Sequence, residues 1–228
     1  MKTLLIAAVL ALVSWSSQAQ VTASTDTLAL PPTLMPGDSD WRQVIFTNDT
    51  GEPIQVFGTG SNGPFATGWD CSGGTYVFLP PYGTCTLDVS FRPREGQPLG
   101  LAEGLVGFRL ATGTILVDLI GFSYTNDPLS GVRNLIDSLA PLGFAAPADG
   151  QLQALLGVIE SVLLDGRPNN DRSACGRLGR FIRIVEEEAA NERVFEWSAV
   201  AAVVQAQAAG ATLGCGSRAA PANGPRAA

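Results

Sequence analysis

Four cysteines are the residues of this sequence whose chemistry is most distinctive: Cys71, Cys85, Cys175 and Cys215. Cysteine pairs bind zinc or exchange disulfides, and both kinds of site favour CxxC spacing. No CxxC occurs here, and the 228-residue chain has no histidine to complete a zinc site. The spacing therefore favours structural disulfide bonds, for which four cysteines allow three pairings, and spacing alone does not choose among them.

The other reactive side chains offer little for catalysis. The absence of histidine excludes Ser-His-Asp and Cys-His devices, and Lys2, the sole lysine, lies in a predicted leader. Asp88 and Asp118 alternate with apolar neighbours, so we expect them on the solvent faces of strands. The segment 165–171 is rich in oxygen ligands but lacks the spacing of a calcium loop. We expect no enzyme activity, no cofactor and no metal site.

A candidate binding surface lies around the first two cysteines, where the sequence reads CSGGTYVFLPPYGTC. Trp69, Tyr76 and Tyr82 cluster there, and aromatic side chains on a supported loop can bind a glycan or a peptide. The alternative is that these rings cover one end of a hydrophobic core. Both interpretations stay open at the level of sequence.

The first residues predict export. Lys2 precedes an apolar run over 3–13, and Ser17-Gln18-Ala19 ends the segment with small residues. This is the layout of a secretory signal peptide (1–19) cleaved after about Ala19. The run is short for a membrane span, which needs about 20 residues. We expect a secreted or periplasmic protein without a transmembrane segment in the mature chain.

Charge limits the partners. The chain has 14 basic and 21 acidic residues, a formal net charge of −7. Such a chain has no electrostatic footprint for nucleic acid. The remaining partners are an unidentified protein or a glycan.

The first half of the mature chain, 20–125, predicts a β-domain. Its clearest runs of strand-forming residues are 41–47, 54–57, 85–91, 105–110 and 114–120. Only Ala111-Thr112-Gly113 separates the last two, which predicts a hairpin. Short strands with Gly- and Pro-rich connections are typical of an antiparallel sandwich or barrel.

The second half, 126–216, changes to a helical period. Val132, Leu135, Ile136 and Leu139 share one helical face. Further helices are predicted from about Gln151 to Leu163, with Asp149 as cap, from Asp171 to about Glu188, and from Trp197 to Leu213. Gly214 is placed to end the last helix, and the tail 217–228 is expected to be disordered.

The predicted helices suggest one cysteine pairing. Cys175 lies in the first turn of the third helix and Cys215 just beyond the fourth. At ~1.5 Å per residue, two antiparallel helices of these lengths bring both cysteines to one end. A Cys175–Cys215 bond would close a loop of about 40 residues, worth ~3–4 kcal/mol in the chain-entropy model. Cys71 and Cys85 are then left to pair within the β-domain.

The β-half also resembles a known family in several motifs: TNDTGEPI over 47–54, Phe65, Cys71, LPPYGTC over 79–85, FRP over 91–93 and LIG over 119–121. Their order is similar to that of bacterial choice-of-anchor D modules and their Hydin-type (ASH-like) immunoglobulin-fold relatives. The loops 48–51 and 80–83 are each longer than the family pattern. The resemblance implies a sandwich of seven to eight strands, often with a loop disulfide.

The helical half resembles a second family, the FIMAH domain of secreted bacterial proteins. The likeness rests on Ala174-Cys175, Leu178, Phe181-Ile182 and Val185, and on Leu213-Gly214-Cys215. Neither resemblance supplies catalytic residues.

Taken together, the predicted fold class is mainly β plus α, an immunoglobulin-like antiparallel β-sandwich followed by a small four-helix bundle. We expect a secreted, non-enzymatic structural, adhesion or protein-interaction protein of a bacterial envelope or extracellular space. The alternatives are a glycan-binding module that uses the loop aromatics and a periplasmic assembly factor that uses a sheet edge.

Overall fold

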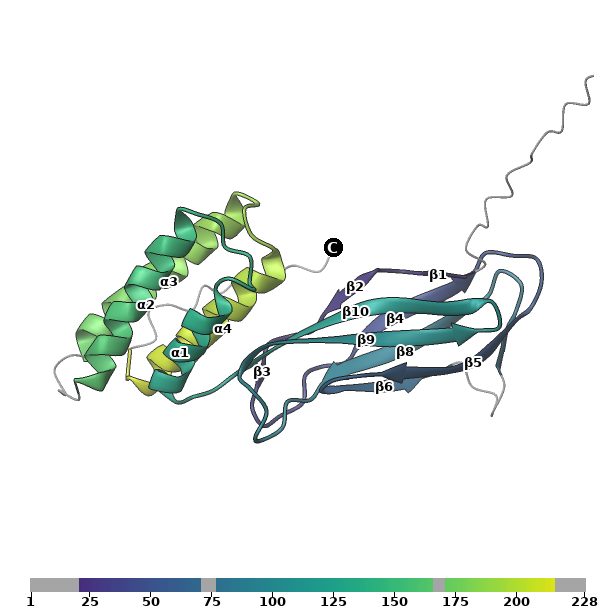
Figure 1. Cartoon of the computed structure of the whole chain (residues 1–228), viewed down its shortest axis with the longest axis horizontal. Coiled ribbons are helices and arrows are strands. Elements are labelled where there is room, and N and C mark those ends of the chain that lie inside the picture. The colour runs from purple at the N-terminus through teal and green to yellow at the C-terminus, as the bar shows by residue number, and fades with distance from the viewer. Residues whose placement is uncertain (1–20, 71–76, 166–170, 216–228) are drawn as a thin grey trace, which may run out of the picture.

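The computed structural model describes residues 21–70, 77–165 and 171–215. These residues form a two-sheet β-sandwich followed by four helices, and the helices lie beyond one end of the sandwich (Figure 1). The predicted fold class is therefore confirmed.

The first sheet, sheet A, contains four strands in the order β1 (Val21–Ala23), β4 (Arg42–Asn48), β8 (Thr84–Phe91) and β6 (Phe65–Trp69). The second, sheet B, has the order β2 (Thr27–Ala29), β10 (Gly113–Tyr124), β9 (Gly100–Leu110), β5 (Ile54–Ser61) and β7 (Val77–Leu79), and β3 (Thr33–Leu34) also pairs with β10. All pairs are antiparallel except those that β2 and β3 make with β10.

The five predicted runs became β4, β5, β8, β9 and β10, and the hairpin of β9 and β10 turns at Ala111-Thr112 as expected. The described chain contains ten strands, more than the seven to eight that the family resemblance implied. The additional strands, apart from the five-residue β6, are two or three residues long. Such short pieces carry too little alternation to be recognised in sequence.

Aromatic side chains fill the sandwich. Phe46 stacks on Phe108 across the two sheets with ring centroids 4.2 Å apart. Phe91, the first residue of the FRP motif, lies against the backbone of Gly121, the last of LIG. A Cβ on Gly121 would come within 2.6 Å of the Phe91 ring, so the two motifs fit one another physically.

The helices are α1 (Pro128–Ser138), α2 (Ala148–Leu164), α3 (Asp171–Ala190) and α4 (Glu196–Thr212). Each packs against two others in the closed order α1, α2, α3, α4 (Figure 1). Small residues of α4, among them Ala202, Ala206 and Ala209, are buried and allow its neighbours to approach closely. None of the described helices is long and apolar enough to cross a membrane.

One predicted helix cap is wrong. Asp149 lies inside the first turn of α2, and the N-cap is Pro147. The amide of Asp149 already donates to the carbonyl of Ala145 at 3.0 Å, so helical hydrogen bonding begins before this residue. Its side chain accepts a bond from Gln153.

The predicted end of α4 is confirmed. Gly214 has φ +69°, its amide donates to Ala211, and the amide of Cys215 donates to Gly210 at 2.9 Å. These two bonds form a Schellman motif, which turns the chain back along the helix. Cys215 thereby lies against Gly210, where a Cβ would come 3.6 Å from its Sγ, an ordinary contact distance.

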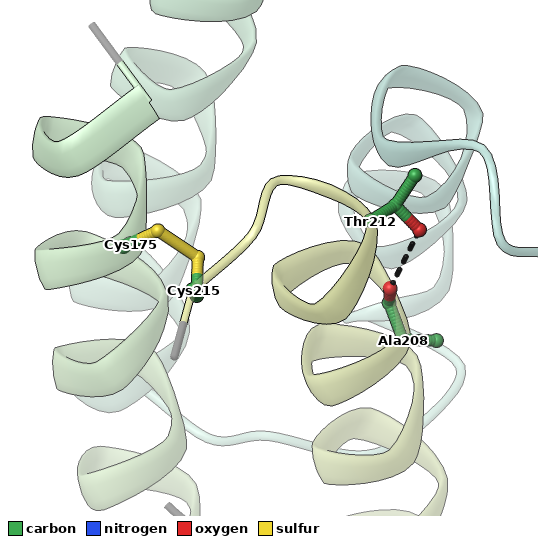
Figure 2. Close-up of a disulfide and its surroundings, with 4 residues drawn as sticks. All are labelled: Cys175, Ala208, Thr212 and Cys215. Carbon is green, nitrogen blue, oxygen red and sulfur yellow. Dashed lines mark hydrogen bonds between the residues drawn. A yellow bond between two sulfur atoms is a disulfide. The ribbon is translucent and has the colours of Figure 1, made fainter. Parts of the chain in front are cut away.

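The turn brings Cys215 to the predicted partner, Cys175 of α3 (Figure 2). The two cysteines form a disulfide with their Cα atoms 5.4 Å apart. At the same end of α4, the Thr212 hydroxyl lies 2.5 Å from the carbonyl oxygen of Asn126 and 3.1 Å from that of Ala208. The last turn of α4 is therefore tied both to α3 and to the segment that enters α1.

A buried polar cluster joins the sandwich to the helices. The side chain of Gln205 on α4 is fully buried and bonds the backbone of Thr125 at both its amide and its carbonyl, 3.3 and 3.1 Å away. Asn134 of α1 donates to Gln205 at 3.1 Å and to the carbonyl of Ser123 at 3.3 Å. We call Ser123, Thr125, Asn134 and Gln205 the junction cluster. Phe122 of β10 also packs in the helical core, so the two parts share buried surface.

Candidate functional site

Tyr82 is the most exposed of the described residues in the predicted binding surface, with a relative exposure of 73%. It lies in the turn Pro80-Pro81-Tyr82-Gly83, closed by a bond from the Gly83 amide to the Pro80 carbonyl at 2.9 Å. Tyr82 has φ 55°. A positive φ at the third residue of such a turn normally requires glycine or asparagine. This chain holds a tyrosine there.

Two turns hold Tyr82 in place. The side-chain amide nitrogen of the fully buried Asn48 bonds the carbonyls of Glu52, Leu79 and Pro80 at 2.8–3.2 Å. The Tyr82 amide donates to Thr50 at 3.1 Å. Asn48 thus ties the turn after β4 to the turn that carries Tyr82.

The Tyr82 ring lies over Gly51, where a Cβ would come 3.4 Å from the phenolic oxygen. The loops 48–51 and 80–83 are the two turns that meet here. Together they support one exposed aromatic ring.

Two further phenylalanines are exposed on neighbouring strands of sheet B. Phe78 of β7 is 60% exposed and Phe57 of β5 is 41% exposed. Phe78 pairs with Gln55, which alternates with the buried Ile54 and Val56. We call Phe57, Phe78 and Tyr82 the aromatic edge, because β7 is the last of the described strands of sheet B on this side.

Sequence reasoning found Tyr82 but not the other two members of the aromatic edge. The alternation of IQVF over 54–57 places Phe57 opposite in phase to Ile54 and Val56, a signal that could have been used. The run Val77-Phe78-Leu79 is apolar throughout and gives no such signal.

The other two residues of the predicted binding surface are Trp69 and Tyr76. Trp69 ends β6 in sheet A and is 38% exposed. Tyr76 and Cys71 lie outside the described residues. Cys85 is buried on β8 and disulfide-bonded. Its pairing with Cys71 stays a prediction.

The carboxylates that could have formed an acid–base pair do not come together. Asp88 belongs to β8 in sheet A, and Asp118 belongs to β10 in sheet B. Their neighbours Leu87, Val89, Val117 and Leu119 are all buried between the sheets. The two side chains therefore lie on opposite outer faces, as their alternation predicts.

The described residues of the oxygen-rich segment 165–171 form the end of one helix and the start of the next. Asp165 is the C-cap of α2, Asp171 begins α3, and 166–170 lie outside the described residues. Within the described ranges, no three His, Cys, Asp or Glu side chains are grouped to hold a metal ion.

Comparisons with known proteins give remote likenesses. No family model matches the chain, and no curated protein matches it. Among solved structures, an ASH/PapD-like domain of human CEP192 is 13% identical, with 46% of this chain and 86% of that chain covered and a TM-score of 0.35. The secreted serine protease VesC of Vibrio cholerae is 14% identical over 51% of this chain and 26% of that chain, with a TM-score of 0.35.

The Pseudomonas aeruginosa CupB2 chaperone is 11% identical, with 53% of this chain and 61% of that chain covered and a TM-score of 0.34. The chain thus spans only part of VesC and of CupB2. With TM-scores this low, the likenesses assign neither a family nor a function. The resemblances to choice-of-anchor D and FIMAH modules stay predictions.

Proposed function

We propose that this protein is an extracytoplasmic, non-enzymatic adhesion or protein-interaction module that binds a partner protein through the aromatic edge. The observation that carries this proposal is Tyr82. A left-handed conformation costs a residue with a side chain about 1–2 kcal/mol. Glycine would avoid that cost, so the exposed ring is retained at the expense of stability, as is common at binding sites.

Several exposed aromatic side chains on one margin support the same proposal. Contiguous apolar surface on a water-soluble domain is typical of contacts with other proteins. Tyrosine and phenylalanine supply large contact area with little loss of side-chain freedom on binding. The Asn48 bonds hold the Tyr82 turn before any partner arrives, which lowers the entropic cost of association.

The position of β7 suggests how the partner binds. Among the described strands, β7 pairs with β5 alone, and an edge strand can accept an extended segment by backbone hydrogen bonding. We propose that the partner supplies such a segment and that its side chains pack against Phe78 and Tyr82.

Two features support the proposed compartment and the absence of catalysis. The Cys175–Cys215 disulfide suits an oxidising environment, as does the predicted leader over 1–19. The separation of Asp88 from Asp118 across the sandwich leaves no carboxylate pair for hydrolysis at those positions.

Site-specific photocrosslinking in the producing organism tests the proposal. A photoreactive phenylalanine analogue replaces Tyr82 or Phe78 in the exported chain, and adducts are identified by mass spectrometry. Leu116, which is 56% exposed on β10, is the matched control position. The proposal predicts one discrete protein adduct from the aromatic edge and none from Leu116.

A second substitution sharpens the result. Phe78→Ser in the chain that carries the Tyr82 probe should reduce the adduct strongly, because it removes a second exposed aromatic ring of the proposed binding surface. The same adducts from all three probe positions, or none from Tyr82 and Phe78, would contradict the proposed role.

A further inference from the structure

The outer face of sheet A carries a shallow groove that is separate from the aromatic edge. The groove has a volume of about 350 Å³ and is lined by Trp41, Gly68 and Asp88. Trp41 directly precedes β4, and the Tyr82 turn bonds the other end of β4 at Asn48. The two surfaces therefore lie at opposite ends of this strand.

The strand register explains why these residues meet. Asp88 on β8 pairs with Gln43 of β4 on one side and with Gly68 of β6 on the other. Gln43, Asp88 and Gly68 thus form one row across the outer face. Trp41 is two residues before Gln43 and begins the adjacent row.

Trp41 provides an oriented aromatic surface. The guanidinium carbon of Arg92 lies 5.2 Å from the ring centroid, and 49% of the tryptophan remains exposed. Arg92 is held in turn by the hydroxyl of Ser90, which accepts a bond from its Nε at 3.2 Å, and by Asp38 at 3.7 Å. Because these contacts restrain the arginine, the indole is restrained as well.

Gln43 and Asp88 provide fixed polar atoms beside the ring. The side-chain amide of Gln43 donates to Oδ1 of Asp88 at 2.9 Å. Among the described residues, no protein group donates to Oδ2 of Asp88 or to Oε1 of Gln43, and the indole N–H of Trp41 has no protein acceptor. The groove therefore offers two acceptors and one donor next to an apolar face.

The side of the groove formed by β6 has almost no side chain. Gly68 has none, and a Cβ added there would meet only the Cβ of Asp88, 3.9 Å away. The preceding residue on the same face is Ala66. A flat ring can therefore approach Trp41 and Asp88 across this strand.

We propose that this groove binds a neutral oligosaccharide. The C–H face of a sugar ring would pack on the exposed surface of Trp41. Its hydroxyl groups would donate to Asp88 and Gln43 and accept from the indole N–H. The mixture of one apolar face with a few convergent polar groups is the usual composition of a ligand site.

The same atoms disfavour other ligands. A phosphate or a carboxylate would meet the negative charge of Asp88, and Arg92 is already engaged by Asp38 and Ser90. A purely apolar segment would remove water from Asp88 and Gln43 without replacing its hydrogen bonds, which is costly. A ligand rich in hydroxyl groups satisfies both.

Nuclear magnetic resonance titration tests the proposal. The isotope-labelled full chain is titrated with hexasaccharide fragments of cellulose, chitin, starch, xylan and mannan to millimolar concentration, and the Trp41 indole N–H signal is followed. The proposal predicts that at least one of these sugars shifts this signal saturably. Trp197 of α4 reports on another part of the chain and should be unaffected.

Two glycine substitutions distinguish the groove from other surfaces. Gly68→Val places a side chain in the groove and should weaken binding by at least about tenfold, a large effect for one contact. Gly60→Val is the matched control, because Gly60 lies on β5 and a Cβ there meets nothing within 4 Å. Both positions lie in strands, where valine is well accommodated.

The outcomes are decisive in either direction. Saturable binding that Gly68→Val weakens and Gly60→Val leaves unchanged supports the proposal. Absence of a Trp41 shift with every sugar overturns it, as does binding that survives Gly68→Val. Because the aromatic edge is intact in both variants, failure here would leave the proposed protein-binding role standing.

Discussion

At the scale of single residues, the molecule uses buried amides to fix exposed features. Asn48 holds the turn of Tyr82, and Gln205 holds the backbone at Thr125. A buried amide that loses a partner costs free energy because it cannot bond water instead. Each of these side chains therefore favours one backbone arrangement. The exposed residues carried by that backbone are held in place as a result.

Asp127 allows a prediction about pH. It caps α1, and bonds from the Ser130 hydroxyl and from the Ser130 amide (2.8 Å) lower the pKa of its carboxyl below the ordinary 3.8. A lowered pKa means that this stabilisation is complete above the ordinary value and disappears as pH falls through the lowered folded value.

Two substitutions separate the cap from its charge. Asp127→Ala should lower the free energy of unfolding at neutral pH by about 0.5–2 kcal/mol, as expected for a lost N-cap. Asp127→Asn retains a capping oxygen without the titration. The difference in free energy of unfolding between Asp127→Asn and the natural chain, measured in urea, should therefore shrink as pH falls below 3.8. A difference that is constant with pH would contradict the assignment.

At the scale of elements, the sequence predicted the strands and helices that have a clear hydrophobic periodicity. Strands such as β8 and β10 alternate over many residues, and the helices repeat apolar residues at regular intervals, so both classes were recognised. The Cys175–Cys215 bond was predicted because helix length converts directly to distance.

The missed features depend on tertiary contacts instead. β1, β2 and β3 are short because the first segment of the sandwich changes from sheet A to sheet B. Asp149 looked like a cap, but the chain before it was already bonded to the helix. The exposure of Phe78 depends on β7 being an edge strand, which local sequence does not record.

Glycines in the helices permit a matched test of packing. A Cβ on Gly131 of α1 would lie 2.5 Å from Nε2 of Gln205, which is buried and bonded to Thr125 and so has no room to retreat. Gly131→Ala should therefore destabilise the protein by about 1–3 kcal/mol, as overpacking does.

Gly157 of α2 is the control, because a Cβ there meets nothing within 4 Å. Gly157→Ala should stabilise the protein by about 0.5–1 kcal/mol through helix propensity alone. Both values come from chemical unfolding curves. Equal effects of the two substitutions would show that the close approach of α1 and α4 does not restrict residue 131.

At the scale of the whole molecule, the junction cluster and Phe122 couple the sandwich to the helices. Gln205→Ala removes both bonds to the partly buried backbone of Thr125, at about 0.5–1.5 kcal/mol for each bond. We expect the natural chain to unfold in one calorimetric transition and Gln205→Ala in two, with helical circular dichroism lost in only one of them.

The exposed Gln151 of α2 provides the control, since its removal breaks no side-chain bond in the described structure, and Gln151→Ala should keep a single transition. Two transitions in the natural chain would mean that the two parts are not coupled by these contacts.

The exposed ring of Tyr82 is proposed to bind a protein partner. The most direct measurement is the dissociation constant of the crosslinked partner for the natural chain and for Tyr82→Asn, by calorimetry. Asparagine tolerates positive φ, so this variant should fold with unchanged or higher thermal stability. We predict that it binds the partner at least about tenfold more weakly, as for a contact central to an interface. Equal affinity of the two proteins would contradict the claim.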